Sequence, residues 1–229
     1  MITGEQLLEA VATYNQAIWP MQIIGYVLAG ITVFLAFKKP VWVSRINFAV
    51  LAFFWLWVAL MYWLPSAGPA FPIGYVFLLF FLIEGGLFLF QAIKPKLAFG
   101  TYNQLHTIGG LTMILYTMIG YPLLAIFLDH PYPQASLIGL TPCPLTLYTF
   151  GLLLLARSAI PIHLLIIPLF WALSGALWIS IGMWEDVGMV LGGIIAFVLI
   201  LMRNKQLKTE EKLKNQDQSS EAWSLNVSE

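Results

Sequence analysis

Seven apolar segments, each close to the length that crosses a lipid bilayer, dominate this 229-residue chain. A transmembrane helix needs about 20 predominantly apolar residues. The segments cover residues 17–37, 45–64, 72–93, 105–128, 138–156, 160–182 and 184–203. Charged residues make up only 10% of the chain, against about 25% in a soluble domain. We therefore predict an all-α fold, a polytopic membrane helix bundle with seven transmembrane helices.

Polar segments flank the predicted helix-bundle domain, which covers residues 16–203. Residues 1–15 begin with a capping-box pattern, Thr3-x-x-Gln6, which predicts a short amphipathic helix at the membrane interface. The apolar residues on one face of this helix are Leu7, Leu8, Val11 and Tyr14. Residues 204–229 are polar and mixed in charge, so we predict a disordered tail.

The basic residues alternate between the two sides of the predicted bundle. Before the tail they fall in the loops after the first, third and fifth spans: Lys38, Lys39, Arg45, Lys94, Lys96 and Arg157. Because basic loops stay in the cytoplasm, this pattern places the N-terminus outside and the C-terminus in the cytoplasm. In a six-span alternative, Pro142 and Pro144 make the fifth segment re-entrant. That arrangement puts the tail outside and breaks the charge pattern.

Glu84 lies in the middle of the 72–93 span, far from any other charge in the sequence. A carboxyl at that depth is costly to bury and by default marks a functional site. Gln91 follows seven residues later on the same helical face. The two residues predict an intramembrane polar site for a small solute or ion, as in a small transporter or permeation protein. The alternative is a structural carboxyl that is hydrogen-bonded to a Tyr, Thr or Trp of another span.

Cys143 is the only cysteine and lies in a Thr-Pro-Cys-Pro turn, where the prolines favour the first turn of a helix. A helix N-terminus stabilises the thiolate form of a cysteine. Together with Asp129 and His130 of the preceding loop, Cys143 is a candidate thiol or metal site with hard and soft ligands. The alternatives are a buried cysteine that acts as a small apolar residue and loop side chains that are simply solvated. The spacing matches no recognised zinc pattern.

The remaining histidines, His106 and His163, lie near the cytoplasmic ends of their spans. Such a pair could ligate a haem from two helices, although axial ligands normally lie well inside a helix bundle. We predict no cofactor, and the chain has none of the common nucleotide-binding or hydrolase motifs. The sequence therefore gives no indication of an enzyme, and the lack of a basic patch of the nucleic-acid-binding kind argues against such a partner.

Small residues in the last span predict close helix contacts. The Gly188-x-x-x-Gly192 spacing lets two helix backbones approach each other. It can serve the interior of the bundle or a homo-oligomer, and the sequence leaves both open. The second function class that we consider is a non-transporting sensor or scaffold whose last two spans bind a partner.

Four segments carry a resemblance to a known family: Tyr14–Pro20 (YNQAIWP), His130–Pro133 (HPYP), Thr141–Thr146 (TPCPLT) and Ile166–Trp171 (IIPLFW). With its Asn-x-x-Ile-Trp-Pro opening and Thr-Pro-Cys-Pro turn, the chain resembles a family of uncharacterised multi-pass bacterial membrane proteins, a domain of unknown function. The resemblance implies an all-helical protein of the bacterial cytoplasmic membrane. It implies no activity.

Overall fold

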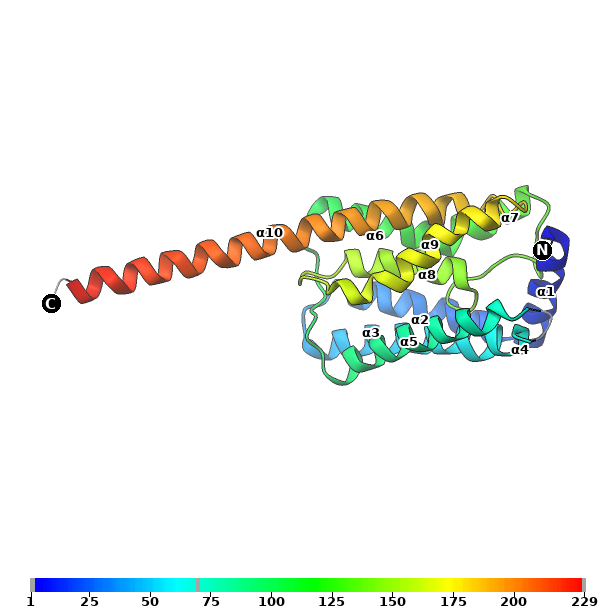
Figure 1. Ribbon diagram of the computed structural model, residues 1–229, viewed down its shortest axis with the longest axis horizontal. Helices are drawn as coiled ribbons and strands as arrows, with labels where there is room; N and C mark the ends of the chain where they lie inside the picture. The colour runs from blue at the N-terminus through cyan, green and yellow to red at the C-terminus, as the bar shows by residue number, and fades with distance from the viewer. Residues whose placement is uncertain (1–2, 69–70, 228–229) are drawn as a thin grey trace.

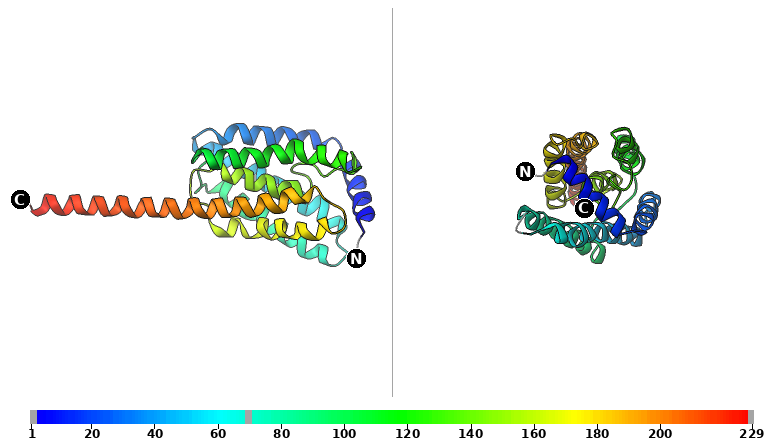
Figure 2. Two further views of the ribbon diagram at one scale, coloured as in Figure 1. Left: turned by 90° about the horizontal axis from the view of Figure 1, so that it is seen from above. Right: turned by 90° about the vertical axis from the view of Figure 1, so that its right-hand side faces the viewer.

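The computed structural model describes residues 3–68 and 71–227, with the backbone alone for residues 219–227. Over these residues the protein is a helical bundle whose long helices run back and forth between two ends (Figure 1). The main helices are α2 (Met21–Ala36), α3 (Val41–Trp57), α5 (Ile73–Ile93), α6 (Gln104–Leu115), α8 (Pro142–Leu154), α9 (Ile166–Ile179) and α10 (Asp186–Val227). The short helix α1 (Gly4–Ala17) lies across one end of the bundle (Figure 2).

Two of the long helices contain a π-helical turn. The turn η1 (Val58–Trp63) joins α3 to α4 (Leu64–Ser66), and η2 (Tyr116–Gly120) joins α6 to α7 (Tyr121–Phe127). Pro122 contributes to the second irregularity, because it has no N–H for the carbonyl of Met118, four residues earlier. The hydroxyl of Tyr26 on α2 donates to this carbonyl instead, at 3.0 Å. A neighbouring helix thus satisfies the backbone group that the proline leaves open.

The short helix α8 is buried on all sides. Every one of its residues is buried except the half-buried Cys143, and it packs against α6, α9 and α10. The Tyr148 hydroxyl also donates to the Ala29 carbonyl of α2, at 2.9 Å. Its 13 residues rise by about 20 Å, which is roughly two thirds of the hydrocarbon thickness of a bilayer. α8 is therefore the central helix but does not extend the full length of its neighbours (Figure 1).

Arg203 of α10 is fully buried and holds the C-terminal end of α8. Its Nη1 donates to the backbone carbonyls of Leu153 and Leu154, both at 3.2 Å, and of Ala156 at 2.6 Å. A helix leaves its last four carbonyls without intrahelical partners, and a cation there also offsets the negative end of the helix dipole. Arg203 therefore caps α8 from a neighbouring helix.

Within the described residues, five helical segments are long and apolar enough to cross a membrane: Val41–Ser66, Ile73–Ile93, Gln104–Phe127, Ile162–Ile179 and Asp186–Gln218. α1 and α2 make a sixth if they are counted as one span with an 87° bend. The predicted 138–156 span is reduced to α8, because the helix begins only at Pro142 and ends at Leu154. The structure thus gives five or six apolar helices of spanning length, which indicates a membrane protein, rather than the seven predicted.

The chain after Arg203 differs from the predicted disordered tail. α10 continues through residues 204–227 as one helix that projects away from the bundle (Figures 1 and 2). Most residues there are lysine, glutamate, glutamine and leucine, all of which favour helix. Residues 1–2 of the predicted amphipathic helix and 228–229 of the predicted tail lie outside the described residues.

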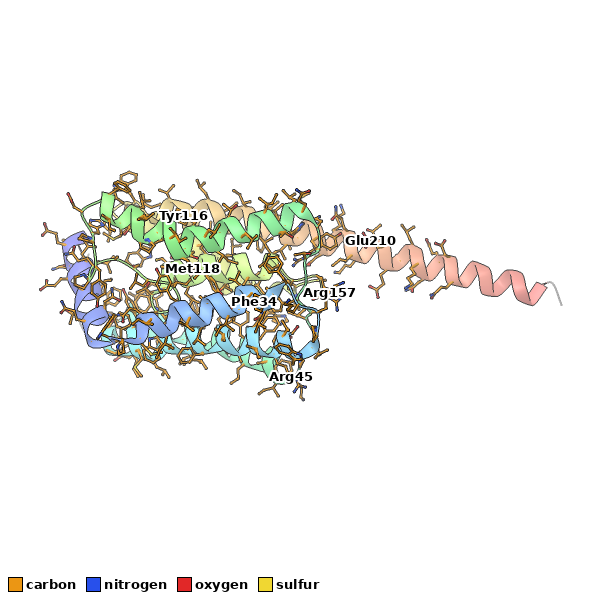
Figure 3. All side chains as sticks on the ribbon, turned by 180° about the vertical axis from the view of Figure 1, so that it is seen from behind. Phe34, Arg45, Tyr116, Met118, Arg157 and Glu210 are labelled. Carbon is orange, nitrogen blue, oxygen red and sulfur yellow. The ribbon has the colours of Figure 1, made fainter. Side chains whose placement is uncertain are left out.

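The two ends of the bundle carry opposite charge. We call them the α1 end, which α1 covers, and the tail end, from which α10 emerges. All eleven lysines and arginines lie at the tail end or beyond it on α10, and Figure 3 shows Arg45 and Arg157 there. The charged side chains at the α1 end are all acidic: Glu5, Glu9, Asp129, Glu185 and Asp186. Under the positive-inside rule the tail end would be cytoplasmic, and this orientation stays a prediction.

Candidate binding site at the α1 end

A small cavity of about 40 Å³ lies at the N-terminus of α8, in the space that this short helix leaves open. Pro142 and Cys143 of α8 line it, and α1 contributes Leu7, Leu8 and Val11. The remaining lining residues come from five other parts of the chain: Tyr62, Trp63, Tyr121, Gln134, Ser136, Trp171, Trp178, Met183, Glu185 and Asp186. The cavity therefore combines aromatic walls with two carboxyl groups.

Asp186 is the first residue of α10 and is only 2% exposed. The hydroxyl of Tyr121 donates to its Oδ1, and the thiol of Cys143 donates to its Oδ2 at 3.4 Å. An acidic side chain is favoured in the first turn of a helix, where the dipole is positive. Neither partner of Asp186 is a base, so the structure places a buried carboxyl among neutral donors.

Glu185 precedes Asp186 and is also buried. Its Oε1 lies 3.7 Å from Nδ1 of His130, while its Oε2 has no hydrogen-bond partner among the residues that the structure describes. The hydroxyl of Tyr116 on η2 donates to its backbone carbonyl at 2.7 Å. The loop that leads into α10 is thus fixed by side chains from two other segments.

Unpaired polar atoms gather around this cavity. Among the described residues, the indole Nε1 atoms of Trp63 and Trp178, which both line the cavity, are buried without a hydrogen-bond partner, as is Oε2 of Glu185. Buried polar groups in proteins nearly always have a partner, and exceptions call for an explanation such as water or a ligand. A cavity of about 10–15 Å³ holds one water, so this one has room for about three water-sized groups that could pair with these atoms.

Hydrogen bonds hold α1 in place as a wall of the cavity. Nδ2 of Asn15 donates to two backbone carbonyls of the 128–141 loop, those of Pro133 at 2.7 Å and Ala135 at 2.8 Å. The Tyr14 hydroxyl donates to the Leu140 carbonyl at 2.7 Å. Burial raises the pKa of Tyr14 above its ordinary value, so the phenol stays a neutral donor.

The predicted start of α1 is confirmed. The Thr3 side chain accepts the backbone N–H of Gln6, and the Gln6 side chain accepts the backbone N–H of Thr3. The two bonds form the reciprocal capping box that the spacing predicts. The apolar face of the helix then turns Leu7, Leu8 and Val11 toward the cavity.

The residues predicted as a thiol or metal site are only partly brought together. Cys143 lies in the first turn of α8, as predicted, and contacts Asp186 rather than Asp129. His130 reaches Glu185, while Asp129 is exposed and has a φ of 59°. Among the described residues no three His, Cys, Asp or Glu side chains form a group that could hold a metal ion. Cys143, Asp129 and His130 therefore do not form a group of metal ligands in this structure.

Glu84 and Gln91 are both buried on α5 but do not line the cavity. Within the described residues, both carboxyl oxygens of Glu84 lack a hydrogen-bond partner. The structural alternative predicts a Tyr, Thr or Trp donor for this carboxyl, and none is found there. Oε1 of Gln91 accepts the backbone N–H of Lys96 at 3.5 Å and so helps to close the turn after α5. Glu84 and Gln91 are seven residues apart, which is about 10.5 Å along the helix. The Gln91 side chain binds the turn after α5, whereas the Glu84 carboxyl does not take part in that contact.

His106 and His163, the two histidines considered for a haem, have different surroundings. Both ring nitrogens of His106 already have oxygen neighbours, Asn103 Oδ1 at 2.7 Å and the Leu199 carbonyl at 3.0 Å. His163 is exposed on the 3₁₀ turn η3 (Ile162–Leu164).

The glycines predicted for helix contacts face the chain's own bundle. A Cβ on Gly188 would lie 2.3 Å from a ring carbon of Tyr116, and one on Gly192 would lie 2.6 Å from a methyl group of Leu147. Both glycines therefore serve internal packing. A homo-oligomer that packs through these glycines stays a prediction. Both glycines already face side chains of the same chain.

Sequence reasoning missed the central residues of the cavity, which are Asp186, Tyr121 and Trp171. The sequence marks none of the three as a site residue, because Asp186 stands beside Glu185 at the start of an apolar segment and the tyrosine and tryptophan lie within apolar segments. One signal was available in the topology. The N-terminal ends of α8 and α10 meet at the α1 end, so an acid and a thiol at those two starts could have been paired.

One family model matches this chain, over residues 4–211, and its description is a family of unknown function, DUF6064. No curated protein and no solved structure gives a significant match. All four segments that carry the resemblance described above meet around the cavity. Asn15 binds the carbonyl of Pro133, and Cys143 and Trp171 line the walls.

Proposed function

Since this chain belongs to DUF6064, a family of unknown function, we propose its role from the cavity itself: it is a membrane protein that captures a small ammonium-type cation. The buried Asp186 carboxyl inside an aromatic-walled cavity is the observation that carries this proposal. A cation bound there would pair with a carboxyl that has only neutral donors around it. Its positive charge would also be attracted to the faces of the surrounding rings.

The size of the cavity limits the ligand to a few heavy atoms. About 40 Å³ corresponds to roughly three water-sized groups, which suits a methylammonium or ethanolammonium ion. The indole N–H groups of Trp63 and Trp178, which have no partner within the described part of the chain, would donate to an oxygen of the ligand or to water beside it. An ammonium ion with a hydroxyl group fits both the acceptors and the donors of this site.

The charge of the α1 end supports the same ligand class. The charged side chains there are acidic, and all lysines and arginines lie toward the other end. Clustered charge of one sign raises the local concentration of ions of the opposite sign and speeds their association. The α1 end would therefore attract cations and repel anions before any contact with the cavity.

The test is a titration of the purified protein, followed by intrinsic fluorescence because three tryptophans line the cavity. We expect saturable changes with methylammonium and ethanolammonium, and none with ethanol or acetate at the same concentrations. Asp186→Asn should weaken binding by about 10–100-fold, since a charged hydrogen bond is worth about 1.5–3 kcal/mol. Asp129→Asn, which removes an exposed acid at the same end, is the matched control. Equal binding of ethanol, or an unchanged affinity in Asp186→Asn, would refute the proposal.

Transport of the captured cation is a second candidate function, and Glu84 favours it. Its fully buried carboxyl has no hydrogen-bond partner on either oxygen in the part of the chain that the structure describes. Such groups inside membrane helices commonly belong to ion or proton pathways. In proteoliposomes, transport predicts uptake of labelled methylammonium that Glu84→Gln abolishes while binding at the cavity persists. If the unaltered protein binds methylammonium but does not take it up, the protein is a receptor or sensor rather than a transporter.

A further inference from the structure

A groove separate from the cavity lies at the tail end, between α10 and the loop that joins α8 to α9. Its volume is about 660 Å³, within the range of small-molecule sites. The loop contributes residues 159–162, and α10 contributes one face from Leu201 to Lys212. No acidic side chain is among the residues that line the groove.

The two walls are fixed to each other by hydrogen bonds. The Asn204 side chain accepts the backbone N–H of Ile160 at 2.9 Å and donates to the carbonyl of the same residue at 2.6 Å. Arg203, one residue earlier, binds the carbonyls at the end of α8. These bonds fix the loop against α10, so the groove is already formed before a ligand binds.

The groove is divided into an apolar part and a cationic part. Ile162 and Leu201 are 49% and 39% exposed and lie toward the bundle. Lys205, Lys208 and Lys212 follow on the α10 side. Their spacing of three and four residues puts the three ammonium groups on one helical face.

Within the described part of the chain the three lysines are not held in ion pairs, although Glu211 follows Lys208 by three residues on α10. Like charges at this spacing repel one another and destabilise the helix. An anion in the groove would remove that repulsion and gain attraction from all three.

We propose that this groove binds the headgroup of an anionic phospholipid, with its phosphate at the three lysines and the start of an acyl chain on Ile162 and Leu201. The lysines begin just past the apolar part of α10, where lipid headgroups would lie if α10 crosses the membrane. Basic pockets between membrane helices on the cytoplasmic side are suited to such headgroups. The exposed apolar half of the groove favours a lipid over free phosphate, because a small soluble anion would leave it uncovered.

The test uses the full chain, purified and stripped of lipid in detergent, with native mass spectrometry as the readout. Dioctanoyl phosphatidylglycerol and dioctanoyl phosphatidylcholine have the same chains and differ in headgroup charge. We expect the first to bind at least 10-fold more tightly, because each lysine near an anionic surface contributes about a factor of five. The triple variant Lys205→Gln, Lys208→Gln, Lys212→Gln should lose this preference.

The matched control is Lys38→Gln, Lys39→Gln, Lys96→Gln, which removes three exposed lysines from other loops of the same end. It should keep the preference for phosphatidylglycerol. An equal loss in both triple variants would mean diffuse attraction rather than a site and would overturn the proposal. Inorganic phosphate that competes as strongly as the lipid would overturn it as well, in favour of a small-anion site. None of these outcomes depends on cation binding at the α1 end.

Discussion

The crossing of α6 and α8 is closer than any side chain would permit. A Cβ built on Gly110 would lie 2.7 Å from the carbonyl oxygen of Gly151, and one on Gly151 would lie 2.9 Å from the carbonyl oxygen of Gly110. Gly109, the neighbour on α6, has room: its nearest contacts would be methyl groups of Leu199 and Leu154 at 3.6 and 3.7 Å. The two adjacent glycines therefore offer a matched pair of substitutions to alanine.

We expect Gly110→Ala to destabilise the protein and Gly109→Ala to leave it unchanged or more stable. Alanine favours a helix over glycine by about 1 kcal/mol at either position, so this contribution cancels in the comparison. Overpacking against a backbone oxygen costs about 1–3 kcal/mol, and only Gly110→Ala incurs it. At roughly 2–4 °C per kcal/mol for a chain of this size, Gly110→Ala should melt about 2–12 °C below Gly109→Ala.

Thermal unfolding in detergent, followed by tryptophan fluorescence, measures this difference. Gly151→Ala should resemble Gly110→Ala because the contact is reciprocal. The double variant of Gly110 and Gly151 should lose less than the sum, since moving the helices apart once relieves both clashes. Equal Tm values for Gly109→Ala and Gly110→Ala would show that the two backbones are not in contact at this crossing.

Three further substitutions probe the contacts that hold the bundle together. Tyr26→Phe leaves the Met118 carbonyl without its donor and should cost about 1–3 kcal/mol, whereas the exposed Tyr75→Phe should leave the Tm unchanged; similar melting of the two would contradict this role. Arg203→Met uncaps α8 and should cost about 3–5 kcal/mol, against less than about 0.5 kcal/mol for the exposed Arg157→Met. Equal Tm losses would mean that the buried guanidinium contributes nothing specific. Asn15→Ala frees the 128–141 loop and should speed hydrogen exchange of its amides, unlike the exposed Gln16→Ala; unchanged exchange in both would rule out this anchor.

Local patterns predicted the parts of the fold that depend on local physics. Apolar runs located the helices to within about six residues, except at the C-terminal end of α10, which continues to Val227 instead of ending near residue 203. The Thr3–Gln6 spacing gave the capping box of α1. The Pro-Cys-Pro turn correctly indicated a helix start at Pro142. The length of α8 was overestimated, because an apolar loop that folds into the bundle has the same composition as the end of a span.

The candidate site could not be predicted in the same way, because it depends on which ends of separate helices meet. Glu84 is an isolated charge in the sequence, yet its carboxyl has no hydrogen-bond partner among the described residues. Asp186 stands beside Glu185 at the start of an apolar segment, and only the arrangement of α7, α8 and α10 brings Tyr121 and Cys143 to it. Such contacts join residues 43 and 65 positions apart, beyond the reach of helical periodicity.

The two ends of α8 are both held by α10. The Asp186 carboxyl lies at the positive N-terminal end of the α8 dipole, beside Cys143, and the Arg203 guanidinium lies at the negative C-terminal end. Sliding one helix along the other by a single turn, about 5.4 Å, would separate both pairs at once. These two contacts therefore fix the register of α8 against α10, and we expect the two helices to move together in any rearrangement of the bundle.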